Sequence, residues 1–193
     1  MDKIEVEGIK NLKGNIQISG SKNSSLPILA SSLLIDDEMV ISNIPNLSDI
    51  KFMIKILESL GSKVNFKNSI CKIKSNQPRN LKISYELVRK MRASFLILGP
   101  LLTKYGYAEV SLPGGCAIGT RPVDLHLFAL KKLGAKIKIK DGYIIAEAKK
   151  GLFVSKIKFP SVSVGATENA LLAAYGATGK TVLYNCAVEP EIL

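Results

Sequence analysis

The chain has 193 residues, 47% of which are hydrophobic, so it is long and apolar enough to form one sizeable core or two small ones. Its formal net charge is +11, but 23 of the 27 basic residues are lysines spread along the chain, and the six Phe and six Tyr are not interleaved with basic clusters. This pattern is typical of a solvated lysine-rich surface and not of a nucleic-acid-binding protein, although a positive field also helps to gather a polyanionic small substrate.

The sequence carries no sign of export or membrane insertion. Residues 1–14 alternate apolar and polar side chains and include acids, so they lack the basic start and apolar centre of a secretory signal. The longest apolar stretch, residues 94–102, is about half as long as a membrane span. Three cysteines, Cys71, Cys116 and Cys186, are odd in number and far apart, so no disulfide framework is expected. A reducing, cytoplasmic location fits these features best.

Residues 15–23 predict a strand that leads directly into a helix. The run NIQIS at 15–19 alternates as a strand does, and Ser21, Lys22 and Asn23 open the apolar helix that follows. Such a helix start offers unpaired backbone N–H groups, a positive dipole end and a lysine to an anion. An ordinary serine-capped helix accounts for the same residues.

Internal repeats organise the rest of the chain. In three segments, small residues open an apolar helix and a short strand follows at a constant offset of 16 residues. The residue pairs that mark this offset are Ser24 and Val40, Ser94 and Val110, and Ala166 and Val182. The repeat period is therefore 70 and then 72 residues.

The first two segments continue with a second shared element. Residues 57–66 and 130–139 each end a helix at Leu-Gly and enter a strand, with Gly61 and Gly134 as left-handed helix caps. A hairpin follows each, most clearly at Asp141-Gly142. Each unit is thus predicted to comprise a helix, a strand, a second helix and two hairpin strands.

The third unit is predicted to be incomplete. Aligning Asn43 with Asn185 places the end of the chain where the second helix of that unit would begin. A half-built repeat leaves an apolar face uncovered. We therefore expect the sequence to be a fragment of a longer protein or one half of an assembly of two pieces. Self-association through the uncovered face is a further expectation.

Residues 113–128, PGGCAIGTRPVDLHLF, concentrate residue types that are rare elsewhere in the chain. Two glycines before Cys116 give this loop freedom to move, and basic groups nearby would favour a thiolate. Arg121 follows the loop, and Arg92 opens the equivalent helix of the second unit. Two of only four arginines at such positions indicate bidentate binding of phosphate or carboxylate. Surface ion pairs and an inert small cysteine are the alternative interpretations.

The remaining reactive side chains carry weaker predictions. Cys71 falls in a predicted hairpin strand and Cys186 follows a strand, so both are expected to be inert. His126, the only histidine, lies at the start of an apolar helix and is expected to be a packed or capping side chain rather than a general base. No residues have metal-ligand spacing, and no metal or cofactor is expected.

Four segments carry a specific resemblance: SGSKNSSLPILASSLL at 19–34, VRKMRASFLILGPLL at 88–102, VSLPGGCAIGTRPVDLHLFALKKLGAKI at 110–137 and VGATENALLAAYGATGKTVLYNCAVEPEI at 164–192. In order and nearly end to end, they resemble the bacterial UDP-N-acetylglucosamine 1-carboxyvinyltransferases, a family of enolpyruvyl transferases. The PGGCAIG-x-RPVD loop is highly specific for that family.

The resemblance implies an α/β fold in which repeated helix-strand-helix-hairpin units form inside-out α/β barrels. Members have two globular domains of three such units each, with the active site between the domains. Residues 1–20 would then be a strand segment belonging with an absent second domain. Residues 21–193 would form the first barrel domain, truncated in its third repeat.

The resemblance also implies an activity. Members transfer the enolpyruvyl group of phosphoenolpyruvate to the 3-hydroxyl of UDP-N-acetylglucosamine and release phosphate, the first committed step of peptidoglycan synthesis. Cys116 would be the mobile-loop thiol, which can add to phosphoenolpyruvate, is given a general-acid or product-release role, and is alkylated by fosfomycin. Lys22, Arg92 and Arg121 would hold phosphate and carboxylate oxygens as the transition state forms. Asn23 would bind the sugar nucleotide.

Two further segments would contact the nucleotide. The uridine would be lined by Arg121, Pro122, Val123, Asp124 and Leu125, and the diphosphate region by Ser163, Val164 and Gly165. Many members have a lysine where this chain has Ser161, which puts one nucleotide contact in doubt. The expected partners are therefore these two small-molecule substrates, with no nucleic acid and no membrane.

By the same resemblance, the aspartate base and several phosphoenolpyruvate-binding arginines belong to later segments, so the isolated chain is expected to be inactive. A non-catalytic binding module made from a truncated gene is one alternative. The sister enzyme 5-enolpyruvylshikimate-3-phosphate synthase is a second, against which the cysteine loop argues. A nucleic-acid-end enzyme of similar repeat architecture is a third, but no catalytic histidine motif is visible.

Overall fold

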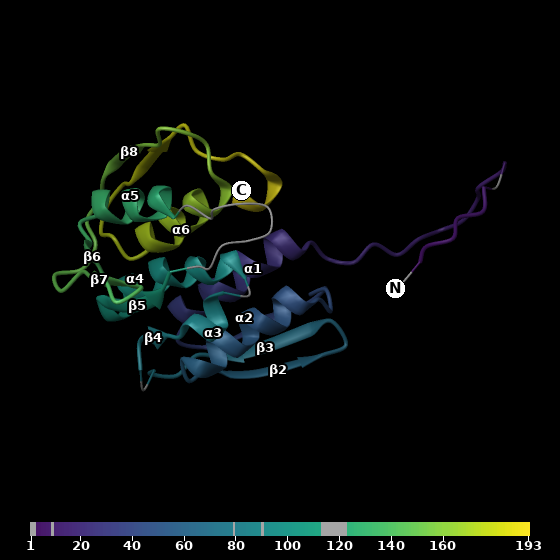
Figure 1. The fold of residues 1–193 in the computed structure, drawn as a ribbon, viewed down its shortest axis with the longest axis horizontal. Coiled ribbons are helices and arrows are strands. Elements are labelled where there is room, and N and C mark those ends of the chain that lie inside the picture. The colour runs from purple at the N-terminus through teal and green to yellow at the C-terminus, as the bar shows by residue number, and fades with distance from the viewer. Residues whose placement is uncertain (1–2, 9, 79, 90, 113–122) are drawn as a thin grey trace.

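The computed structural model describes residues 3–8, 10–78, 80–89, 91–112 and 123–193, with the backbone alone at Arg92. Its elements follow the chain in three units (Figure 1). The first contains α1 (Lys22–Ser31), the 3-10 helix η1 (Ser32–Leu34), β1 (Glu38–Ile41), α2 (Ser48–Ser59), β2 (Lys63–Lys67) and β3 (Ile70–Lys74). The second contains β4 (Lys82–Ile83), α3 (Tyr85–Val88), η2 (Arg92–Ile97), α4 (Leu98–Tyr105), β5 (Tyr107–Ser111), α5 (Asp124–Lys132), β6 (Lys136–Lys140) and β7 (Tyr143–Glu147). The third contains β8 (Lys156–Lys158), α6 (Val164–Ala174), β9 (Val182–Tyr184) and η3 (Pro190–Ile192).

The predicted layout of helix, strand, helix and hairpin is confirmed in the first two units. Gly61 and Gly134, at the predicted helix ends, have φ angles of 93° and 96°, in the left-handed region that only glycine adopts freely. Asp141 and Gly142, with φ angles of 50° and 76°, form the two-residue turn between β6 and β7. Three short elements are additions to the predicted layout: the strands β4 and β8, at the starts of the second and third units, and the helix α3 between β4 and η2.

The described strands form three separate sheets. One has the order β1-β3-β2 and is antiparallel throughout, the second has the order β4-β5-β7-β6, and the third pairs β8 with β9. In the second and third units, the strand before the first helix pairs in parallel with the strand after it, β4 with β5 and β8 with β9. The fold is therefore α/β, and the described sheets form no closed barrel.

The helices α1, α4 and α6, one from each unit and called the inner helices below, form the inner layer, with the sheets outside them (Figure 1). Their inward side chains are fully buried: Leu29, Ala30, Leu101, Leu102, Ala166, Ala170 and Ala173 are each 0% exposed. Alanine dominates the inner positions of α6, which lets the neighbouring helices approach its backbone closely.

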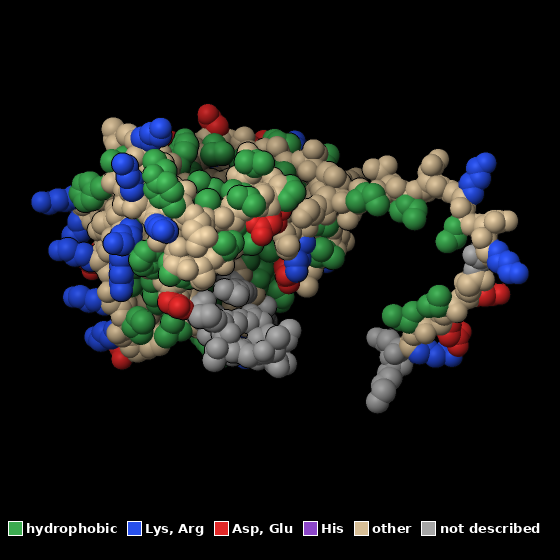
Figure 2. Space-filling model, turned by 90° about the horizontal axis from the view of Figure 1, so that it is seen from above, with side chains coloured by type: hydrophobic (Ala, Val, Ile, Leu, Met, Phe, Trp, Pro, Cys, Tyr) green, Lys and Arg blue, Asp and Glu red, His purple; other side chains and the backbone are tan. Residues whose placement is uncertain are grey.

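Residues 15–19, predicted to be a strand, do not form one within this chain, and their pairing with a second domain stays a prediction. Residues 12–20 form neither helix nor strand, and the N-terminal segment projects from the body as an extended arm (Figure 1). Ile16 and Ile18 are 86% and 73% exposed, and Figure 2 shows apolar side chains along the arm, clear of the body. A strand needs a neighbour that pairs with its backbone groups, and the described part of the chain offers this segment none.

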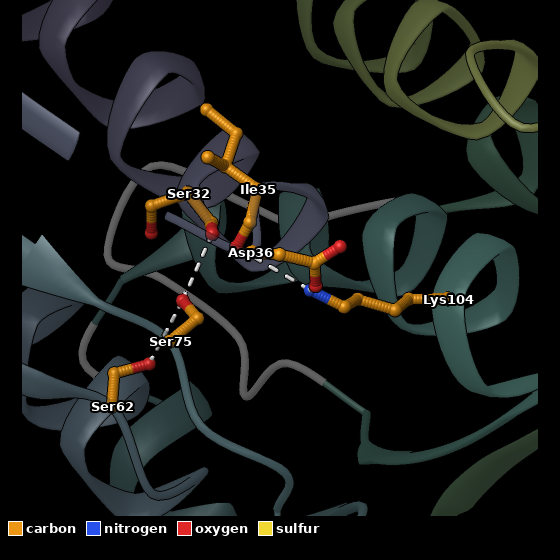
Figure 3. A network of polar contacts seen from close by, with 6 residues as sticks. All are labelled: Ser32, Ile35, Asp36, Ser62, Ser75 and Lys104. Carbon is orange, nitrogen blue, oxygen red and sulfur yellow. Dashed lines mark hydrogen bonds and ion pairs between the residues drawn. The ribbon is translucent and has the colours of Figure 1, made fainter. Parts of the chain in front are cut away.

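Polar contacts surround the end of the first inner helix and tie it both to α4 and to its own unit (Figure 3). Lys104 Nζ, near the end of α4, lies 2.8 Å from Asp36 Oδ1 and donates a hydrogen bond to the Ile35 carbonyl at 3.4 Å. Ser75 Oγ donates to the Ser32 carbonyl at 2.9 Å. Both bonds satisfy carbonyl groups at the end of the first inner helix; the contacts of Lys104 hold this end against α4, and the bond from Ser75 holds it to the segment after β3.

Candidate functional site

The inner helices run parallel, so their N-termini lie at one end of the molecule. The Gly99 N–H donates to Asn169 Oδ1 at 2.8 Å, and Thr103 Oγ1 donates to the Ala173 carbonyl at 2.9 Å. The second contact lies four residues further along both helices than the first. Contacts that move in the same direction along α4 and α6 show that the two helices are parallel. The contact of Lys104 with Asp36 likewise places the end of α4 beside the end of the first inner helix. Helix N-termini carry partial positive charge and free N–H groups, so this shared end favours anions.

The start of α1 is capped as the sequence predicts. Ser21 has an extended backbone, and its Oγ accepts a hydrogen bond from the Ser24 N–H at 3.3 Å. Ser25 Oγ donates to the Ser21 carbonyl at 2.6 Å. Lys22 and Asn23 are therefore held in the first turn with exposed side chains.

The ammonium group of Lys22 already faces a carboxylate. Its Nζ lies 3.1 Å from Oδ2 of Asp49, which stands in the first turn of α2. The two side chains are 44% and 31% exposed, so water screens the pair and its contribution to stability is small. Asp49 orients the ammonium group while leaving it accessible to an anion.

A close backbone contact fixes the entry of the chain into α1. The Gly20 N–H donates to Asn43 Oδ1 at 3.1 Å, and a Cβ added at Gly20 would lie 1.8 Å from the Asn43 carbonyl oxygen. Asn43 itself has a φ of 58°, which asparagine tolerates better than most residues. Residue 20 must therefore be glycine if Lys22 and Asn23 are to keep this position.

Arg92 opens the inner helix of the second unit, as predicted, but the first part of that helix is a 3-10 helix rather than an α-helix. The backbone changes to α-helix at Leu98, two residues before Pro100. Proline has no N–H and cannot donate to the carbonyl four residues earlier, which weakens an α-helical path through this region. The side chain of Arg92 lies outside the described part of the structure.

Two more predicted segments lie at helix starts. Val123, which is buried, precedes α5, and Asp124 is exposed in its first turn beside the half-buried Leu125. Ser163 caps α6, because its Oγ accepts a hydrogen bond from the Ala166 N–H at 3.4 Å. Val164 and Gly165 form the first turn of α6 and are partly exposed.

A buried amide joins these helix starts. Asn169, in α6, is 1% exposed, and its Nδ2 lies 3.0 Å from the Phe95 carbonyl and 3.1 Å from His126 Nδ1. The His126 ring is 3% exposed and packs edge-on against Phe95, with ring centroids 6.1 Å apart. The prediction that His126 is a packed side chain is confirmed. These contacts bring residues 123–125 and 163–165 side by side, next to η2.

Cys116, Arg121 and Pro122 lie outside the described residues, so their predicted roles stay predictions. The other two cysteines are free thiols within the described part of the chain. Cys71 is 0% exposed, and burial raises its pKa to about 11, so it is a poor nucleophile. Cys186 is partly buried, with Sγ 3.9 Å from the Leu183 carbonyl.

One carboxyl group near this end has an unusual environment. Glu168, in α6, is 8% exposed, and burial raises its pKa to about 7, with further contributions from Glu191 and Glu189. The neighbouring acids disfavour its ionised form because like charges repel. The Glu168 carboxyl group therefore gains or loses its proton near neutral pH.

Two negative findings apply to the described residues alone. They contain no cluster of three or more His, Cys, Asp or Glu side chains that could hold a metal ion. None of their helices is long and apolar enough to cross a bilayer.

A family model described as EPSP synthase (3-phosphoshikimate 1-carboxyvinyltransferase) matches residues 6–193. The chain belongs to the EPSP synthase family. Solved structures share its fold at low sequence identity. The enolpyruvyl transferase NikO from Streptomyces tendae superposes with a TM-score of 0.79 at 19% identity, over 94% of this chain and 42% of that one. EPSP synthase from Acinetobacter baumannii gives a TM-score of 0.75 at 16% identity, over 93% and 42%.

Curated relatives in the EPSP synthase family are much more similar in sequence. The UDP-N-acetylglucosamine 1-carboxyvinyltransferase of Pelagibacter ubique is 57% identical over 192 residues, which is 100% of this chain and 46% of the relative. The protein of the same name from Campylobacter fetus is 51% identical over 193 residues, with the same coverage. The chain therefore spans about half the length of the curated relatives that it matches.

Sequence reasoning missed three residues that organise this end of the family fold. Asn43 holds Gly20, Asp49 holds Lys22, and Asn169 joins three helices. Asn169 had a visible signal, because an amide within the small apolar helix ATENALLAA needs buried partners. No such signal marks Asn43 or Asp49 in the sequence, since polar residues in a turn and at a helix start are common.

Proposed function

We propose that the protein represented by this chain transfers the enolpyruvyl group of phosphoenolpyruvate to the 3-hydroxyl of UDP-N-acetylglucosamine, with release of phosphate, in peptidoglycan synthesis. The observation that carries this proposal is the 50–57% identity, across the whole chain, to proteins named for that activity. The structure supports it with a set of helix N-termini at one end of the molecule, a suitable environment for two highly anionic substrates.

The residues proposed for this chemistry divide between the two substrates. Lys22, Arg92 and Arg121 hold phosphate and carboxylate oxygens of phosphoenolpyruvate, and Cys116 supplies the reactive thiol of the loop. Asn23 binds the sugar nucleotide. The uridine contacts residues 121–125, which are Arg121, Pro122, Val123, Asp124 and Leu125. The diphosphate contacts residues 163–165, which are Ser163, Val164 and Gly165. Fixed cations and helix N–H groups act here by stabilising charge that grows in the transition state.

The sugar nucleotide fits the geometry of the described segments. The starts of α5 and α6 lie side by side through the contact of His126 with Asn169, so one extended ligand can reach both. Helix N–H groups at Val164 and Gly165 suit a diphosphate. Ser161, exposed and close to this turn, offers no positive charge to it.

We further propose that residues 1–20 belong with a second domain and that residues 21–193 form the first barrel domain. The exposure of Ile16 and Ile18 supports this, because apolar side chains along an extended segment favour burial against another surface. Some apolar side chains of the third unit, among them Val162, Tyr175 and Val188, are also exposed, and self-association through them stays a prediction.

The second candidate is EPSP synthase itself, which the family description names. Titration calorimetry distinguishes the two acceptors. We expect saturable binding of UDP-N-acetylglucosamine and none of shikimate 3-phosphate, and the reverse would overturn the proposal. Asn23→Ala should weaken nucleotide binding, whereas Asn65→Ala, at an exposed position of β2, should leave it unchanged.

The chain alone should not complete the reaction. With phosphoenolpyruvate and UDP-N-acetylglucosamine present, we expect no phosphate release above background. The reason is that the aspartate base of the family belongs to a part of the relatives that this chain does not span. Turnover near a typical enzyme rate of about 10 per second would contradict the proposal that the reaction needs a base from outside this chain.

A further inference from the structure

The side chain of Asn169 occupies a break in the backbone hydrogen bonding of the second unit. In an unbroken α-helix the Gly99 N–H would donate to the Phe95 carbonyl. Here the Gly99 N–H donates to Asn169 Oδ1 at 2.8 Å, and Asn169 Nδ2 donates to the Phe95 carbonyl at 3.0 Å. The carboxamide of α6 thus replaces the missing backbone bond where η2 meets α4.

This insertion is sterically specific. A Cβ at Gly99 would lie 2.6 Å from the Asn169 carbonyl oxygen and 2.7 Å from its Oδ1. The close approach of the two helices therefore requires glycine at position 99. Because Asn169 is only 1% exposed, a residue without both a donor and an acceptor at this position would leave a backbone group unsatisfied.

The same bonds determine which nitrogen of His126 carries a proton. The Gly99 N–H can only donate, so the atom of Asn169 that faces it is the oxygen, and the atom that faces His126 is the NH₂ group. Asn169 Nδ2 lies 3.1 Å from His126 Nδ1, which must therefore accept the hydrogen bond. A ring that accepts at Nδ1 is neutral and carries its proton on Nε2.

The far edge of the His126 ring packs against the first turn of α6. A Cβ added at Gly165 would lie 3.2 Å from Cε1 and 3.4 Å from Nε2 of the ring. The imidazole, whose orientation Asn169 fixes, therefore lies on the side of Gly165 where a side chain would begin. Ser163, two residues earlier, caps the same turn.

We propose that Asn169 is a positioning residue for the sugar-nucleotide site: it fixes the Nε2-protonated tautomer and the orientation of His126, and the ring fixes the first turn of α6. The nucleotide part of this inference rests on the proposed function, in which that turn holds the diphosphate. Asn169 acts through His126 and Gly165 and touches no substrate. A shift of this turn would misplace the N–H groups that face the ligand, and hydrogen bonds weaken steeply with poor geometry.

The first test is spectroscopic and needs no variant. His126 is the only histidine of the chain, so long-range proton–nitrogen NMR of untagged protein reports its tautomer without assignment. We expect a protonated Nε2 and an unprotonated Nδ1 at pH 8. A proton on Nδ1 would overturn the inference, whether or not the chain binds a nucleotide.

The second test uses Asn169→Asp, which keeps the shape but offers His126 only acceptor oxygens. We expect Nδ1 to become protonated in this variant. The matched control is Asn185→Asp, which removes a comparable bond from Nδ2 to the Phe159 carbonyl, 2.9 Å long, that does not involve His126. An unchanged tautomer in Asn169→Asp, or the same change in Asn185→Asp, would overturn the inference.

The third test measures UDP-N-acetylglucosamine affinity by calorimetry in the same proteins. We expect Asn169→Asp to bind roughly tenfold more weakly and Asn185→Asp to bind as the wild type does. Wild-type binding with no loss in Asn169→Asp would overturn the inference and leave the proposed function standing. No binding by the wild-type chain would overturn the proposed function and the nucleotide part of the inference, and the tautomer would still decide whether Asn169 positions His126.

Discussion

The environment of single side chains at the helix starts differs in ways that the residue types do not reveal. Lys22 is exposed and paired with Asp49, whereas Glu168 is buried beside Glu189 and Glu191. Cys71 and Cys186 are both more enclosed than a loop thiol flanked by glycines would be.

Thiol reactivity should separate the three cysteines. A limiting dose of iodoacetamide should label Cys116 first and Cys71 last, because Cys71 is 0% exposed and its pKa is about 11. Peptide mass mapping gives the order, and Cys71→Ser should leave the labelling of Cys116 unchanged. Labelling of Cys71 or Cys186 ahead of Cys116 would show that the glycine loop is not accessible.

Glu168 should make stability depend on pH near neutrality. Burial raises its pKa from 4.5 to about 7, so between these values the folded chain keeps a proton that the unfolded chain has released. The free energy of unfolding should therefore fall as pH rises from about 5 to 7. Glu168→Gln should remove this dependence and stabilise the chain at pH 8 by roughly 1–2 kcal/mol.

Urea unfolding at pH 5 and pH 8 measures this effect. Glu58→Gln, an exposed position of α2, is the matched control and should preserve the pH dependence. The same slope in Glu168→Gln as in the wild type would assign the dependence to other groups.

The positions of the helices depend on how closely helices of different units pack, as well as on the sequence of each helix. Alanine lines the inner positions of α6, and glycine occupies the point where α4 meets it. Thr103 Oγ1 bonds the Ala173 carbonyl, which adds a polar link along the same contact. The contact between α4 and α6 therefore tolerates little added volume.

Gly99→Ala should disrupt this contact. The new methyl group would lie 2.6 Å from the Asn169 carbonyl oxygen and 3.0 Å from the Ala173 nitrogen, so the helices must separate. We expect a loss of about 3 kcal/mol in the free energy of unfolding, measured by urea titration. Gly14→Ala, where no atom lies within 4 Å, should cost almost nothing. Equal stability of the two variants would refute the close-packing explanation.

At the scale of the whole molecule, the described residues divide into a packed body and an arm. The body carries the core, and the described apolar residues of the arm, Ile4, Val6, Leu12, Ile16 and Ile18, are all at least 73% exposed. An arm that buries nothing contributes nothing to the stability of the body.

Deletion of residues 1–19 should leave the body intact. We expect the free energy of unfolding to change by less than about 0.5 kcal/mol, because the described arm residues make no core contact. Gly20→Ala in the full chain is the contrasting variant and should destabilise the start of α1 through its contact with Asn43. A large loss of stability on deletion would mean that the arm packs on the body in solution.

The sequence by itself determined the units and their local order. The helix ends at Gly61 and Gly134 and the turn at Asp141-Gly142 depend on the conformational preferences of a few adjacent residues, so a local pattern predicts them. The cap at Ser21 and the packed state of His126 were also accessible in this way. The strand predicted at residues 15–19 does not form in this chain, because a strand needs a partner that no local pattern supplies.

Only the tertiary structure decided which residues meet. Asn169 bonds Phe95 and Gly99 from 74 and 70 residues away, and Lys22 meets Asp49 from another helix. No local preference encodes such pairs, because they depend on how parallel helices from successive units pack and on the volume that each residue leaves free. The tautomer of His126 is the clearest case: its type and approximate burial were readable in the sequence, but the atom that holds its proton is set by an amide of another unit.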